Sequence, residues 1–344
     1  MEKFPIIITG KPVEREDKEE LKEIVGKIIE SWREEGKQSF PSEREKTEKE
    51  KNSIETSDVL LRMMFDRFKI PYDKKLVSPE QVHFFTKENF EKEFGNVPVD
   101  AGGFHRARQN TVCLKDGNEN APEGEKEIFD VSDVAHECIH LASKHKYQGV
   151  VGKDDSVTPG QYRVGYDMTT IENKKEISKF KGFNEIENKK AISKFRGFNE
   201  GVVCITQHFL FSDFSEELEK RTGITKEMRQ MSHYSRYSQN QNIVFDIAEA
   251  IGKYRKESPM RSVYRIIKGQ FTGEMAHLRD IDDIFGKGSL DLLAEYQSVS
   301  GTKDDRGRDE LIAEYFQTDA DDGDKREEIK QKIDELKEPV TEGK

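Results

Sequence analysis

Two histidines four residues apart, His136 and His140, most constrain how this 344-residue chain can fold. Four residues are one turn of an α-helix, so on a helix both rings lie on the same face and can reach one metal ion. At 100° per residue, Glu137 lies close enough to hold a water molecule without binding the metal itself. An apolar stripe falls on the opposite face: Val131, Val134, Cys138, Leu141 and Ala142. The sequence therefore predicts a helix with one face in the core and the other carrying metal chemistry.

The ends of this helix are predicted from residues that cap and stop helices. Asp130 is a candidate N-cap, with Asp133 three residues later as its partner, and Gly149 is a candidate stop. His145 falls on the wrong face, so we interpret it as a packed or partly exposed histidine rather than a ligand.

A hydrolytic metal site needs a third protein ligand as well as a water molecule. A third histidine six residues further on is absent, because position 146 is Lys146. The alternative is a carboxylate on a second helix, and Glu200 is the candidate. Asn199 can cap that helix, Gly201 lets two backbones approach closely, and an apolar run follows as far as Phe211.

The motif His136–His140, followed about sixty residues later by Glu200 in Gly-Phe-Asn-Glu-Gly, resembles the gluzincin class of zinc metallopeptidases. The resemblance covers roughly residues 76–300. It implies Zn²⁺ as cofactor, with His136, His140 and Glu200 as ligands and Glu137 as the base. In that fold, Val82–Phe85 and residues 102–114 are strands of a small sheet, the second being its edge strand. Residues 161–166 are then a connecting hairpin or strand.

The sequence departs from the family four positions after Glu200, where gluzincins usually carry an acidic residue that orients a zinc histidine. Here that residue is Cys204, which we interpret as a small buried residue; the alternatives are that another group substitutes for the acid or that the thiol approaches the metal. The family also uses a Tyr or His to stabilise the oxyanion. Tyr237 is the first candidate, with His233 and Tyr234 behind it, although a surface loop of packing aromatics explains them almost equally well.

An internal duplication complicates the choice of the third ligand. Residues 171–185 are repeated as 186–200 with two differences, so Gly-Phe-Asn-Glu ends once in Glu185 and once in Glu200. Only Glu200 is followed by glycine and an apolar helix, so we favour Glu200. The first copy is interpreted as a looped-out insertion, because two units are too few for a solenoid.

The expected fold class is α+β and zincin-like, a small mixed sheet with the active-site helix followed by a mostly helical C-terminal lobe. Residues 1–75 are expected to form a helical N-terminal arm, with helices at 16–34 and 57–68 joined by a mobile polar linker. Residues 76–301 form the peptidase domain, and residues 302–344 a charged tail that ends in a terminal helix. Within the domain, the sheet lobe covers 76–150, the insertion with the duplication 171–200, and the helical lobe 200–301, with helices at 200–221, 242–256, 258–269 and 288–297.

The composition indicates which kinds of partner are disfavoured and which cellular compartment is expected. The net charge of −11 argues against nucleic acid and anionic membranes as main partners. Neither a signal peptide nor an apolar stretch of membrane-spanning length is visible, and three cysteines within apolar segments suit a reducing compartment. The expected location is therefore the cytoplasm.

The leading functional hypothesis is a zinc metallopeptidase, an endopeptidase acting on peptide or protein substrates through a zinc-bound water activated by Glu137. The main alternative is a non-catalytic, zinc-stabilised interaction protein with a degenerate site, suggested by Cys204 and the duplication. A third hypothesis is a zinc hydrolase that acts on a non-peptide amide.

Overall fold

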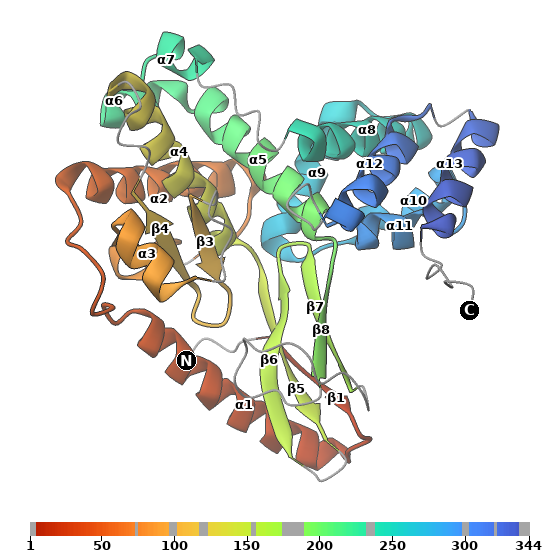
Figure 1. Ribbon diagram of the computed structural model, residues 1–344, viewed down its shortest axis with the longest axis horizontal. Coiled ribbons are helices and arrows are strands. Elements are labelled where there is room, and N and C mark those ends of the chain that lie inside the picture. Colours follow the sequence, from red (N-terminus) through yellow and green to blue (C-terminus); the bar gives the residue numbers. More distant parts are fainter. Residues whose placement is uncertain are drawn as a thin grey trace, which may run out of the picture. The chain divides into compact units, whose positions relative to one another are not determined.

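The computed structural model describes residues 5–72, 75–95, 102–116, 123–152, 156–173, 189–231, 238–297, 303–319 and 322–336. The chain is α+β, which confirms the predicted class (Figure 1). It divides into two compact units. The first comprises Met1–Val164, Thr169–Ile192 and Thr206–His233, and the second Gly165–Met168, Ser193–Ile205 and Tyr234–Lys344. No described helix is long and apolar enough to cross a membrane.

The first unit begins with strand β1 (Ile6–Gly10) and two long helices, α1 (Arg15–Gly36) and α2 (Glu48–Phe68). Helix α1 confirms the amphipathic helix predicted at 16–34, and α2 contains the one predicted at 57–68. The apolar face of α1 forms a cluster in which Val25 and Ile29 pack with Tyr147. The arm is therefore built into the core of this unit.

The prediction of a mobile linker between Gly36 and Thr56 is wrong, because this segment contains the start of a helix and an ion pair. Helix α2 already begins at Glu48, where Thr47 and Glu50 form a reciprocal capping box. Upstream of it, the guanidinium of Arg44 pairs with both Glu50 and Asp116. A Lys- and Glu-rich composition resembles a solvated linker, but here cap and ion-pair geometry order the segment.

A mixed three-stranded sheet has the order β2-β4-β3, formed by β2 (Val82–Phe85), β3 (Gly103–Arg106) and β4 (Thr111–Lys115). Strand β4 pairs in parallel with β2 and antiparallel with β3. Residues 102–114, predicted as one edge strand, thus form a hairpin in which only β3 lies at the edge. The short helices η1 (Pro79–Gln81) and α3 (Lys87–Glu93) flank β2.

The predicted metal helix is α4 (Glu123–Ala142), which packs against α2, β3 and β4. It begins seven residues before Asp130, so the predicted N-cap and its partner lie inside the helix, and the predicted start is wrong. It also ends before Gly149, because residues 145–151 form strand β5 (His145–Val151). Strand β5 lies between β1 and β6 (Val157–Val164), and pairing on both sides overrides continuation of the helix.

The five-stranded sheet has the order β1-β5-β6-β7-β8, completed by β7 (Asp167–Asn173) and β8 (Lys189–Lys194). The prediction of a hairpin or strand at residues 161–166 is confirmed, because β6 turns at Gly165 into β7. The second copy of the duplicated segment supplies β8 and the start of the next helix. Most of the first copy, including Glu185, lies outside the described residues.

The rest of the described chain is helical, as predicted, with two differences. The helix expected at 200–221 divides into α5 (Arg196–Asp213) and α6 (Ser215–Thr222), followed by α7 (Lys226–Met231). The second unit then contains these helices: α8 (Ser238–Arg255), α9 (Pro259–Thr272), η2 (Ala276–Asp280), α10 (Ile281–Phe285), α11 (Ser289–Glu295), α12 (Lys303–Gln317) and α13 (Gly323–Glu335). Helix α12 packs on α8 and buries Ile312 and Phe316, where the sequence predicted only charged tail. Helix α13 matches the predicted terminal helix.

Candidate metal centre

The two motif histidines come from the last two turns of α4. Their ring centroids are 5.2 Å apart, and both residues are 7% exposed. The apolar stripe predicted for the opposite face is buried at Val131, Val134, Cys138 and Leu141, whereas Ala142 is only partly buried. The buried apolar face therefore fixes the rotation of α4 about its axis, and with it the direction in which the two histidines point.

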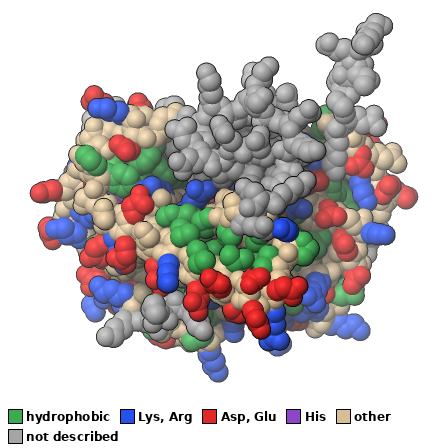
Figure 2. All heavy atoms as spheres, turned by 90° about the horizontal axis from the view of Figure 1, so that it is seen from below, with side chains coloured by type: hydrophobic (Ala, Val, Ile, Leu, Met, Phe, Trp, Pro, Cys, Tyr) green, Lys and Arg blue, Asp and Glu red, His purple; other side chains and the backbone are tan. Residues whose placement is uncertain are grey.

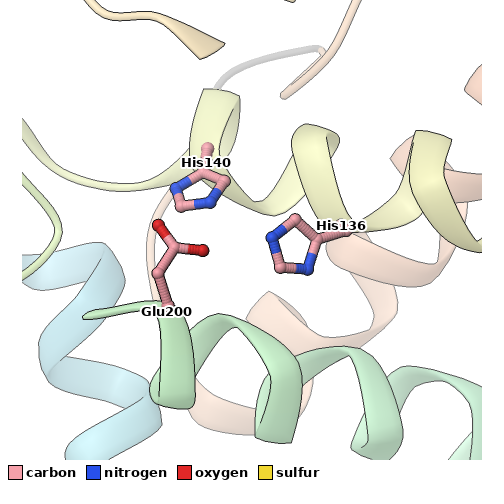
Figure 3. Close-up of side chains that lie close together, drawn as sticks. All are labelled: His136, His140 and Glu200. Atoms are coloured by element: carbon pink, nitrogen blue, oxygen red, sulfur yellow. The ribbon is translucent and has the colours of Figure 1, made fainter. Parts of the chain in front are cut away.

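Glu200 lies within the second turn of α5 and completes a group with the two histidines (Figure 3). Each of the three residues offers one ligand atom, and these atoms lie within 4.8 Å of one another. Figure 3 shows the carboxylate of Glu200 directed toward the two imidazole rings. The structure thus brings together the three residues that the sequence named as ligands.

The spacing of the three residues is compatible with a bound metal ion. Ligand atoms bound at about 2.0–2.2 Å in a tetrahedron lie roughly 3.4 Å from one another. A spread of 4.8 Å at most therefore closes with small side-chain rotations. Two imidazoles and one carboxylate are also a donor set used in catalytic sites that keep one position open. The group could hold a metal ion.

Glu137 is the fourth predicted site residue. It follows His136 on α4, and its side chain is almost fully enclosed, with the residue 9% exposed. A carboxylate in such surroundings is shielded from bulk solvent, which strengthens its interactions with a proton donor. Its place beside the ligand pair on one helix matches the place predicted for a base.

A third histidine, which the sequence did not single out, packs on the ligand pair. His105 on β3 stacks nearly parallel on His140, with ring centroids 6.0 Å apart. Its own ring is fixed by a hydrogen bond between Nε2 and Asn110 Oδ1 at 3.1 Å. Asn110 has a φ of 52° in the tight β3–β4 turn. The three-stranded sheet therefore supports the ligand ring, through contacts between segments that no local spacing reveals.

His145 is buried beside this group, as the prediction of a packed histidine required. Its Nε2 lies 3.4 Å from the backbone oxygen of His140, and its ring meets His105 edge to face. Burial lowers the pKa of His145 well below its ordinary value, and the neighbouring His105 lowers it further. A neutral His145 adds no positive charge beside the ligands.

Two side chains hold α5 on either side of its ligand. Asn199 was predicted to cap this helix, but α5 begins at Arg196, so that prediction is wrong. Instead, Asn199 Oδ1 accepts a hydrogen bond from the backbone N–H of Tyr166 at 2.8 Å and ties the first turn of α5 to the β6–β7 turn. Gln207, two turns after Glu200, bonds to Ser132 on α4. Gly201 approaches the backbone of Asn240 so closely that a Cβ would lie 2.4 Å from its oxygen, which explains the glycine after Glu200.

Cys204 lies one turn after Glu200 and is 3% exposed, in agreement with its interpretation as a small buried residue. The other two cysteines are also buried, and the three form no disulfide. Burial raises the pKa of the Cys113 thiol to about 12, so this thiol stays protonated. Tyr237, the predicted electrophile, lies outside the described residues, as do His233 and Tyr234.

Comparison with known protein families, with curated proteins and with solved structures found no match to this chain. The geometry of the site is therefore the basis for any functional assignment.

Proposed function

We propose that this protein is a zinc-dependent metallopeptidase with a gluzincin-type site on a zincin-like fold, and that it acts as an endopeptidase on peptides or unfolded segments. The observation that carries the proposal is the convergence of His136, His140 and Glu200, from two helices, within 4.8 Å. These residues would hold the cation. The bound cation supplies a Lewis acid that polarises a carbonyl and makes a water molecule acidic enough to attack near neutral pH.

The chain's own contribution to the reaction is proton transfer. Glu137 would accept a proton from the attacking water and later give it to the amine nitrogen that leaves. Its near-complete burial removes competing solvent from that carboxylate. The stacking of His105 on His140 keeps this ring oriented, and His145 packs edge to face against His105.

The charge of the chain favours a polypeptide substrate over a polyanion. Acidic and basic side chains are interspersed on the described part of the face in Figure 2, and apolar side chains gather near the middle of that view. Net charge of −11 also disfavours binding to nucleic acid or an anionic membrane. A compartment with reduced thiols, the cytoplasm, suits the three buried cysteines.

The test combines zinc content with cleavage of a library of internally quenched peptides. Wild type should bind about one zinc per chain and cleave the library, because the ligand set and the base are both present. Glu137→Gln keeps the shape and the ligands but removes the base, so turnover should fall by about 10²–10⁴-fold with zinc retained. A wild type that binds zinc but cleaves no peptide would instead favour a zinc-stabilised interaction protein, and one that cleaves only small amides would favour an amidohydrolase.

A further inference from the structure

A buried amide joins the two helices that carry the candidate ligands. Gln207 Nε2 on α5 donates to both the backbone oxygen and the hydroxyl of Ser132 on α4, each at 2.7 Å. Gln207 is 4% exposed and Ser132 is 1% exposed. One turn away on α5, Val203 and Leu210 are apolar and buried, so packing alone would accept a leucine or methionine of similar volume at position 207. A polar group in this place restricts direction and register rather than filling space.

Helix geometry relates this contact to the ligands. His136 and His140 lie four and eight residues after Ser132, about 6 and 12 Å along the axis of α4. Glu200 lies seven residues before Gln207, about 10.5 Å along α5 and on nearly the same side, because seven residues complete almost two turns. With α5 antiparallel to α4, the Gln207–Ser132 contact places Glu200 level with the turn between the two histidines. The group at His136, His140 and Glu200 has this arrangement.

The contact of the Gln207 amide with Ser132 is compatible with one register of α5 on α4. A slip of one turn moves Glu200 by about 5.4 Å, more than the 4.8 Å that spans the whole ligand group. The same slip leaves the Gln207 amide buried away from its two acceptors, which carries the full desolvation cost of that group. Single buried polar residues fix helix register in coiled coils for the same reason.

We propose that Gln207, through Ser132, is a positioning residue that sets the register of α5 on α4 and so holds Glu200 within bonding distance of the metal. The inference rests on the proposed zinc site and extends it. Gln207 lies three residues beyond Cys204, and the proposed support acts on the carboxylate of Glu200, not on a histidine.

The test compares two variants that each remove a buried hydrogen-bonding group. Gln207→Met keeps the volume but removes both bonds to Ser132. Ser289→Ala is the matched control, because the fully buried Ser289 also makes two hydrogen bonds, with Gly286 and Tyr315, in a helix that holds no candidate ligand. Zinc affinity of the folded proteins is measured by competition with a chromophoric chelator well below their melting temperatures, which are recorded separately.

Gln207→Met should weaken zinc binding about ten- to a hundredfold, the range for residues that hold a ligand in place. Ser289→Ala should lower the melting temperature and leave zinc affinity unchanged within about twofold. In a Glu200→Gln background, adding Gln207→Met should change zinc affinity by less than about twofold, because the ligand it positions is already lost. Ser132→Ala removes only one acceptor, so it should reduce zinc affinity less than Gln207→Met does. It replaces Gln207→Met as the test variant if that protein does not fold.

Unchanged zinc affinity in both Gln207→Met and Ser132→Ala would overturn the inference and leave the proposed zinc site intact. Equal losses in Gln207→Met and Ser289→Ala would also overturn it, because general loosening would then be the cause. A wild-type protein that binds no zinc would overturn the proposed function itself, and the inference with it.

Discussion

Helices α4 and α5 contribute to the same candidate site in different ways. On α4, the ligand pair and Glu137 are set by the pitch of one helix, so their geometry is local. On α5, the single candidate ligand depends on contacts that Asn199, Gly201 and Gln207 make with distant parts of the chain. The difference teaches that a motif can specify half of a metal site from its spacing alone. The other half requires a tertiary register, so it is the part that substitutions at a distance can break.

The largest expected effect comes from removing the ligand on α5. Glu200→Gln should weaken zinc binding by more than about a hundredfold, because it removes a ligand rather than a supporting group. Glu185→Gln, the same change in the other copy of the duplicated sequence, is the matched control and should leave affinity unchanged. Chelator competition on both variants checks this. If zinc affinity fell with Glu185→Gln and not with Glu200→Gln, the third ligand would be Glu185, and the comparison between α4 and α5 would fail.

A smaller effect is expected from the support given to α4. His105→Ala removes the ring stacked on His140, so zinc affinity should fall by about tenfold, within the range for groups that orient a ligand. His105→Phe keeps a flat ring and should retain most of the affinity if stacking is what matters. Isothermal titration of both variants separates the two contributions. Equal affinity in the alanine variant and the wild type would show that α4 needs no such support.

Sequence alone was sufficient where structure is local. The spacing of His136 and His140 predicted a helix that brings the two rings together, and the amphipathic stretch at 16–34 predicted α1. Glu200 was found because glycine and an apolar run follow it. The α+β class also followed from these patterns.

What sequence missed depended on distant partners or on signals hidden by composition. His105 lies 31 residues before His136, and nothing in its surroundings marks it as a neighbour of His140. The order at residues 37–47 rests on partners such as Asp116, 72 residues from Arg44. One signal was available there, because Thr47 and Glu50 have capping-box spacing within the Lys- and Glu-rich run. Helix α12 was missed because its charged residues hide the few apolar side chains that it buries.

The segment between α1 and α2 is a control region for this comparison, because it lies outside both α4 and α5. Burial alone would raise the pKa of Glu43, but hydrogen bonds from His83 and Lys46 outweigh it, so the pKa lies below its ordinary value of 4.5. A lowered pKa in the folded state contributes stability above pH 4.5 that is lost as the pH falls through the folded-state pKa.

Glu43→Gln should therefore lower the free energy of unfolding at pH 7 by about 1.5–3 kcal/mol, the range for a hydrogen bond to a charged group. The difference from wild type should shrink as the pH falls below 4.5. Urea unfolding at both pH values measures it, and zinc affinity at pH 7 should stay within about twofold. A change in zinc affinity equal to that of His105→Ala would mean that this segment acts on the site as well.

The smallest effect is expected at Cys204. Cys204→Ala removes a buried sulfur one turn after Glu200, so stability should fall by about 1 kcal/mol. Zinc affinity should change by less than about twofold, because hydrogen bonds and close packing set the geometry of α5. Thermal unfolding and chelator competition check the two effects. A tenfold loss of affinity would make the thiol part of the site.

The most direct test of the central claim is X-ray absorption spectroscopy of the zinc-loaded protein, because it reports which atoms bind the ion. We expect a first shell of nitrogen and oxygen at about 2.0–2.1 Å, fitted by two imidazoles. In the His140→Ala variant the imidazole contribution should fall to one. A sulfur shell at about 2.3 Å, or three imidazoles in the wild type, would contradict a site built from His136, His140 and Glu200.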